Sequence, residues 1–159
     1  MMSKAKVAMA GVLLSAAALG SALYVQEVMQ WFPCPLCIVQ RYAYLVVASG
    51  FLLALFSAPH GLMRNFAQAV AGLGAIGGAG AAFYHVWVLA NPAQTCGVDP
   101  LQLKLNALPW VQWWPAMFTS DGLCSDVYPP LFGLSLPLWS GLGFVAASLL
   151  TGLLVKARR

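Results

Sequence analysis

The stretch LCIVQRYAYLVVASGFLLALF, residues 36–56, is almost wholly apolar and carries a single charged residue, Arg41. An α-helix rises about 1.5 Å per residue, so about 20 such residues cross the roughly 30 Å hydrocarbon core of a bilayer. Three further apolar runs of this length occupy residues 7–28, 66–90 and 134–155. The sequence therefore predicts an all-α membrane protein built as a four-transmembrane-helix bundle.

The composition of the chain also favours a membrane protein. Of its 159 residues, 61% are hydrophobic and 8% are charged, whereas soluble domains average about 25% charged residues. The net charge of +4 comes from scattered basic residues that form no basic face, so no nucleic-acid partner is expected. We expect residues 1–159 to form a single integral membrane domain.

The first apolar run has a second interpretation, as a cleaved signal peptide. The basic stretch MMSKAK precedes it, and LGSA at residues 19–22 resembles a weak cleavage site. Its apolar part exceeds the roughly 7–15 residues that are usual in a signal peptide. We therefore expect a retained helix.

The charges predict the orientation of the bundle. Six of the eight basic residues fall at one end, and all four acidic residues fall at the other. The positive-inside rule then places both termini in the cytoplasm and the loops 29–35 and 91–133 on the opposite side. In a bacterial inner membrane that side is the oxidising periplasm, where disulfides persist. Every cysteine of the chain is expected there: Cys34, Cys37, Cys96 and Cys124.

The segment CPLCIVQR, residues 34–41, combines two cysteines with an arginine at the start of a helix. Pro35 suits the first helical turn and keeps the preceding residue extended, so Cys34 is expected near the N-cap and Cys37 in the first turn. Free backbone N–H groups and the helix dipole favour a thiolate there. Arg41, one turn further on, is expected to reach back toward the Cys37 sulfur. An arginine that only reaches lipid phosphates is the alternative.

The cysteines and a nearby histidine permit other chemistries. Four cysteines allow three pairings, among which the sequence does not choose. We expect no metal, because Cys96 and Cys124 are far apart and make no second C-x-x-C for zinc. Haem attachment requires a histidine after Cys37, where Ile38 stands. Two inert disulfides in a membrane scaffold stay open, as does the choice for His85 between a packed residue and a donor to a carbonyl ligand.

Two further segments carry structural rather than chemical predictions. Residues 100–115, PLQLKLNALPWVQWWP, space leucines as in a short helix on the membrane surface, with tryptophans at headgroup depth. Residues 72–77, GLGAIG, match a dinucleotide motif formally, but apolar helix continues on both sides. The G-x-x-x-G formed by Gly74 and Gly78 instead predicts close helix packing.

Taken together, these features resemble the disulfide bond formation protein B (DsbB) family. The resemblance rests on four helices, on C-x-x-C-x-x-x-R at the start of the second, and on two more cysteines in the outer segment between the third and fourth. It covers nearly the whole chain. It implies a membrane thiol:quinone oxidoreductase that reoxidises a periplasmic DsbA-like dithiol oxidase and passes the electrons to ubiquinone or menaquinone.

The resemblance also implies a role for each cysteine. Cys96 would be attacked by the reduced partner, and Cys124 would then exchange with Cys34. Cys37 would be the thiolate that faces the quinone, with Arg41 beside it to stabilise the charge.

His85 resembles the family's histidine near the outer end of the third helix, which would place it at the quinone. A paralogue that serves a different thiol partner is an alternative within the same chemistry. A vitamin K epoxide reductase-like protein is disfavoured, because its active C-x-x-C would follow the loop pair rather than precede it.

Overall fold

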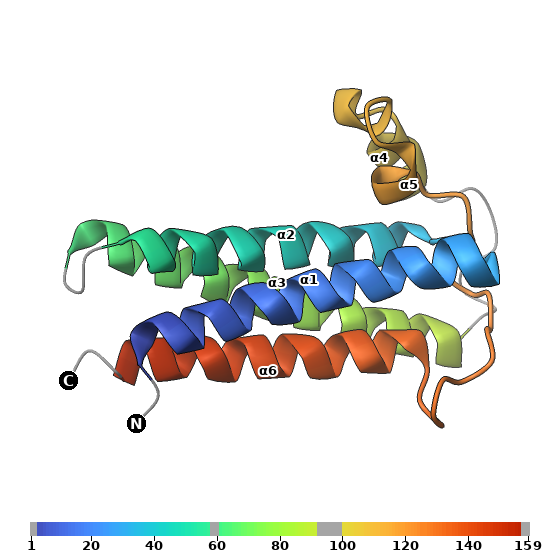
Figure 1. Cartoon of the computed structure of the whole chain (residues 1–159). Helices are drawn as coiled ribbons and strands as arrows, with labels where there is room; N and C mark the ends of the chain where they lie inside the picture. Colours follow the sequence, from blue (N-terminus) through green and yellow to red (C-terminus); the bar gives the residue numbers. More distant parts are fainter. Residues whose placement is uncertain (1–2, 58–60, 92–99, 157–159) are drawn as a thin grey trace.

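The computed structural model describes residues 3–57, 61–91 and 100–156 of the chain. The regular structure of these residues is helical, with one isolated bridge and no extended strand. Four helices run side by side and are long and apolar enough to cross a membrane, which confirms the predicted four-helix membrane fold (Figure 1). Which side of the membrane each end faces stays a prediction. The four spans are α1 (Lys4–Met29), α2 (Pro35–Phe56), α3 (Leu62–Ala90) and α6 (Leu136–Lys156).

The start of α2 follows the local chemistry of its first residues. Pro35 occupies the first turn, and Cys34 is the N-cap, with an extended backbone at φ −79° and ψ 167°. The Cys34 sulfur accepts a hydrogen bond from the backbone N–H of Cys37 at 3.4 Å. The predicted N-cap position of Cys34 is thus confirmed, and the cap fixes both sulfurs at the helix end.

Small residues bring the helices close together. α2 packs most extensively against α3, and α3 packs against α6. A Cβ on Gly74 would lie 2.9 Å from a methyl group of Val46, and a Cβ on Gly78 would overlap the ring of Phe144. The close packing predicted at both glycines is therefore confirmed, and GLGAIG belongs to a packed transmembrane helix rather than to a nucleotide-binding turn.

From residue 100 on, where the structure describes it, the outer segment forms three short helices, α4 (Pro100–Asn106), η2 (Pro109–Val111) and α5 (Pro115–Phe118). They stand beside one end of α2 (Figure 1). The indole of Trp110 donates to the hydroxyl of Tyr42 at 2.8 Å, which ties this segment to α2. The short helix predicted over residues 100–115 is present, although it breaks after Asn106 into separate turns.

Candidate functional site

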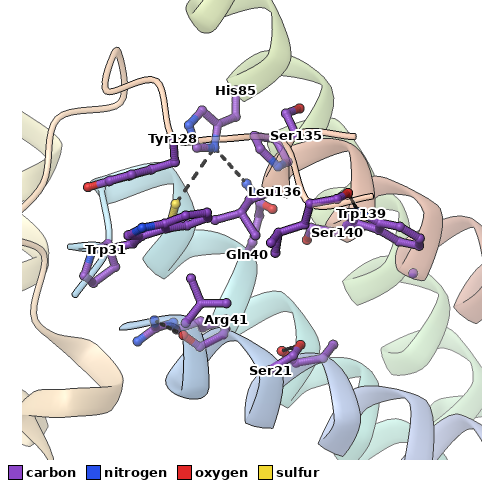
Figure 2. Close-up of a pocket in the computed structure, with 18 of the residues that line it drawn as sticks. Ser21, Trp31, Gln40, Arg41, His85, Tyr128, Ser135, Leu136, Trp139 and Ser140 are labelled. Atoms are coloured by element: carbon purple, nitrogen blue, oxygen red, sulfur yellow. Dashed lines mark hydrogen bonds between the residues drawn. The ribbon is translucent and has the colours of Figure 1, made fainter. Parts of the chain in front are cut away.

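Two cysteines and one histidine meet at the start of α2. The sulfurs of Cys34 and Cys37 lie 3.1 Å apart, and both cysteines are free. His85 reaches them from α3: its Nε2 lies 3.6 Å from the Cys34 sulfur, and its Nδ1 lies 4.0 Å from the Cys37 sulfur. Figure 2 shows the imidazole pointing at a cysteine sulfur. The histidine whose role the sequence left open therefore contacts the dithiol directly.

Gln40 orients this histidine, although it was not among the predicted site residues. Its side-chain NH₂ lies 3.4 Å from Nδ1 of His85 (Figure 2). An amide NH₂ only donates, so Nδ1 accepts, and the proton of the neutral ring lies on Nε2. That N–H faces Cys34, while the lone pair of Nδ1 is the one near Cys37. The available signal was a glutamine inside an apolar span, where a polar side chain needs a partner.

Cys124 lies beside Cys34 at the start of α2. It packs against Cys34, and the two thiols are hydrogen-bonded. Burial raises the pKa of Cys34, whereas the hydrogen bond from Cys34 lowers the pKa of Cys124. Cys34 is therefore the protonated member of the pair and Cys124 the member that ionises first. Cys96, the fourth predicted site cysteine, lies outside the described residues.

We expect Cys124 in the fully reduced protein to be alkylated at lower pH than an ordinary cysteine. A lowered pKa means a larger thiolate fraction at a given pH, and the thiolate is the reactive form. Alkylation of Cys124, followed across pH by mass spectrometry, should show its midpoint moving up in Cys34→Ala, which removes the hydrogen-bond donor. Cys34→Ser keeps a donor and should keep the low midpoint. An unshifted midpoint in Cys34→Ala would contradict this assignment.

The chain that leads to Cys124 is bound to the chain that leads to Cys34. The carbonyl oxygen of Pro33 accepts from the backbone N–H groups of Asp121 and Gly122, each at 3.1 Å. The hydroxyl of Ser120, which is fully buried, donates to the same oxygen at 3.4 Å. These bonds hold the Cys124 segment against the N-cap of α2.

A helix of the outer segment supports this contact. Asn106 of α4 accepts from the backbone N–H of Ser120 at 2.9 Å and donates to its carbonyl at 2.9 Å. Gln102 donates to the same carbonyl at 2.8 Å. Since the backbone of a buried loop residue needs partners, α4 supplies them and so fixes where Cys124 lies. Neither Asn106 nor Ser120 belongs to a recognisable motif, so this network could not be predicted from the sequence pattern.

Replacing Gly122 by alanine is expected to slow thiol exchange between Cys124 and Cys34 by about tenfold or more, since small misplacements of reacting groups are costly. The new Cβ would overlap the carbonyl oxygen of Phe32, a backbone atom that cannot turn aside. The measurement is the rate at which a Cys34–Cys124 disulfide appears in non-reducing peptide maps. Gly80→Ala is the matched control, because a Cβ there meets no atom within 4 Å. Equal rates in the two variants would show that the docking does not control exchange.

Arg41 is buried, with 5% of its surface exposed, and its guanidinium makes four hydrogen bonds to oxygen atoms. The guanidinium therefore joins α5 to α1 across α2. Its role at the site stays a prediction. The four acceptors are the carbonyls of Ala116 at 3.0 Å, Met117 at 3.1 Å and Ala22 at 3.4 Å, and the side-chain oxygen of Gln26 at 2.9 Å.

A cavity of about 720 Å³ opens next to the dithiol. It runs between α1 and α6, from Leu14 and Ala146 deep in the bundle to the cysteines at the start of α2. Cys34, Cys37 and His85 line it, together with Gln40 and Arg41, whereas Cys124 is not among its lining residues. Volumes of roughly 300–1,000 Å³ are typical of small-molecule sites. The arrangement offers an apolar channel with sulfur, imidazole and amide groups at one end.

Comparisons with known proteins agree with this geometry. The family model described as disulfide bond formation protein DsbB matches residues 4–154. The chain is 44% identical to disulfide bond formation protein B 1 of Pseudomonas putida, over 89% of this chain and 83% of that protein. It is 42% identical to disulfide bond formation protein B of Ralstonia nicotianae, over 88% and 87%. A relative of the same name from Herminiimonas arsenicoxydans is 38% identical, over 90% and 87%.

Proposed function

The chain belongs to the disulfide bond formation protein DsbB family, and we propose that it is a membrane thiol:quinone oxidoreductase of the bacterial inner membrane. Its thiol substrate is a DsbA-like dithiol oxidase in the periplasm. In the net reaction the partner's dithiol becomes a disulfide, and its two electrons and two protons pass to a quinone of the ubiquinone or menaquinone type. The cysteine loops face the periplasm and both termini face the cytoplasm, in keeping with the positions of the basic residues.

The position of Cys34 carries this proposal. Its sulfur contacts Cys37 on one side and Cys124 on the other, and Cys37 lines the apolar cavity while Cys124 does not. A thiol that exchanges with both neighbours connects the outer segment to the cavity. Two inert disulfides in a scaffold would not require one sulfur, that of Cys34, to lie beside two other cysteines and a histidine, because exchange would scramble the pairs.

The proposed sequence moves disulfide bonds inward. The partner's thiolate attacks Cys96 and breaks the Cys96–Cys124 bond, so that Cys124 leaves as a thiolate. Cys124 then attacks Cys34 and breaks the Cys34–Cys37 bond, so that Cys37 leaves as a thiolate beside the cavity. Each step makes one S–S bond and breaks one, and no electrons leave the protein.

The second half of the cycle releases the product. The second thiol of the partner attacks the mixed disulfide between the partner and Cys96. The partner then leaves with its own disulfide formed, and Cys96 is freed as a thiol. Cys96 then re-forms its bond with Cys124, which returns Cys34 and Cys37 as a dithiol. When the Cys34–Cys37 bond forms again, two electrons and two protons leave the pair.

The cavity suits a quinone by its size, its apolar walls and its polar end. Cys37, Gln40, Arg41 and His85 would surround the head group, and α1 and α6 would enclose the apolar tail. A bound quinone supplies a lipid-soluble acceptor for two electrons and two protons, strong enough to regenerate an oxidising disulfide. The imidazole of His85 lies beside the Cys37 sulfur, where Nδ1 could take the proton of that thiol once Gln40 releases its hydrogen bond to this nitrogen.

The test combines the purified full chain in detergent, excess quinone and a reduced DsbA-like protein. We expect quinone absorbance to fall only when all three are present, with one quinone consumed per partner disulfide formed. Turnover with another thioredoxin-fold dithiol but not with the DsbA-like protein would favour the paralogue. Failure of every dithiol to drive quinone reduction would favour the non-enzymatic scaffold.

A further inference from the structure

The reduced site has the composition and spacing of a metal centre. The sulfurs of Cys34 and Cys37 and a ring nitrogen of His85 all lie within 4.8 Å of one another. Cys34 and His85 are almost fully buried, with 2% and 5% of their surfaces exposed. The sequence predicted no metal because it offered no second C-x-x-C, but the third group comes from a distant helix.

We propose that the dithiol form of this site binds one thiophilic divalent cation of the Zn²⁺ class through Cys34, Cys37 and His85, with Cys124 as the fourth ligand. The cation would act as a reversible inhibitor that recognises the reduced protein. This inference deepens the proposed function and rests on it for its consequence, the arrest of turnover. Metal binding itself does not depend on quinone reduction.

The distances suit such a cation. Zinc prefers four sulfur and nitrogen ligands at about 2.0–2.3 Å in a tetrahedron, which sets neighbouring ligand atoms roughly 3.3–3.8 Å apart. The sulfur–sulfur distance is 3.1 Å; Nε2 of His85 lies 3.6 Å from the Cys34 sulfur, and the other ring nitrogen, Nδ1, lies 4.0 Å from the Cys37 sulfur. Both sulfurs and one ring nitrogen lie within 4.8 Å of one another, so side-chain rotation that moves the sulfurs roughly 0.7 Å further apart would close the three groups around one ion.

Cys124 is not one of the three groups that lie within 4.8 Å of one another, so it would move toward them from beside Cys34 to act as the fourth ligand. Cys124 packs against Cys34, and the Pro33 and Ser120 contacts hold its segment there. If His85 coordinates through Nε2, its proton moves to Nδ1, where Gln40 can accept it with its amide oxygen turned inward. Metal-bound histidines generally donate their second ring N–H to such a partner.

The consequence follows from the chemistry of thiolates. Each coordinating cysteine gives up one proton, His85 coordinates as the neutral ring, and no electrons are transferred. Thiolate lone pairs engaged by the cation are not free to form the Cys34–Cys37 bond. A disulfide offers no thiolate, so the oxidised protein does not bind. The metal therefore holds the enzyme at the step before its electrons leave.

Cobalt(II) is the probe for this site, because tetrahedral thiolate coordination gives it charge-transfer and visible bands. The full chain in detergent, free of quinone and kept anaerobic, is reduced, separated from the reductant and titrated with Co²⁺. We expect one equivalent to bind, and Zn²⁺ to displace it. His85→Ala and Cys37→Ser should each weaken binding by about tenfold or more. Cys96→Ser, which removes a cysteine outside the proposed ligand set, is the matched control and should bind normally.

Two results would overturn the proposal: no cobalt bands with the reduced protein, or bands that persist in the Cys34→Ser/Cys37→Ser double variant.

Quinone turnover, measured on the same preparation without metal, tests the proposed function separately from the metal site. Turnover without cobalt binding removes the metal site alone. Cobalt binding without turnover by any dithiol removes the proposed function and leaves the metal site standing. Inhibition of turnover by Zn²⁺, reversed by a chelator, is expected where both hold.

Discussion

Replacement of Cys37 by serine is expected to stop quinone reduction, with a loss of at least about 10³-fold, the scale on which removing a covalent nucleophile reduces catalysis. Cys37 combines two features: its sulfur touches Cys34, and it lines the cavity beside His85. Serine fills nearly the same space but forms no disulfide. The inner pair would then have no bond for Cys124 to break, and electrons would stay in the outer pair.

The expected kinetics of Cys37→Ser are specific. Each chain still carries the Cys96–Cys124 bond, so it should oxidise about one equivalent of the reduced partner and then stop, without consuming quinone. Stopped assays of partner oxidation and quinone absorbance measure both quantities. Val39→Ser is the matched control: it introduces the same side chain in the same helical turn, at a residue that does not line the cavity. Sustained quinone consumption by Cys37→Ser would eliminate the proposed relay.

The sequence predicted those features that depend on interactions between residues close together in the chain, and it did not predict those that depend on distant residues. Four apolar runs and the Cys34–Pro35 pair predicted the spans and the start of α2, because hydrophobic length and helix capping are local properties. The contact between His85 and the dithiol depends on how α3 is rotated against α2. That rotation is set by packing at residues such as Gly74, which only the folded bundle specifies.

The same distinction explains the outer segment. The leucine spacing of residues 100–115 predicted a short helix, and α4 formed there. Which part of the segment would hold Cys124 could not be predicted, because the bonds join Asn106 to Ser120 and Ser120 to Pro33 across long sequence separations. Arg41 illustrates the limit most clearly: sequence spacing placed it one turn from Cys37, but its acceptors are on α1 and α5.

The second large effect is expected for Arg41→Ala, which should destabilise the protein by about 2–4 kcal/mol. Hydrogen bonds to a charged group contribute about 1.5–3 kcal/mol each. Part of this loss is offset, because the variant no longer has to desolvate a buried guanidinium. The carbonyls of Ala116 and Met117 would lose their donor, and α5 would lose its connection to α1. Exchange between Cys124 and Cys34 should also slow, since the chain passes directly from α5 to the Cys124 segment.

Two further variants, Arg41→Lys and Gln26→Ala, distinguish the effect of the hydrogen bonds that Arg41 makes to α1 and α5 from the effect of its positive charge. Lysine keeps the positive charge beside the cavity but cannot reproduce the forked contacts of a guanidinium, so an anchoring role predicts that it restores neither the unfolding temperature nor the exchange rate. Gln26→Ala removes one of the four partners and should cost only about 1 kcal/mol. If lysine restores exchange and quinone affinity in full, the charge of Arg41 matters at the site and its contacts to α5 do not. If Arg41→Ala unfolds at the wild-type temperature, the anchor itself is wrong.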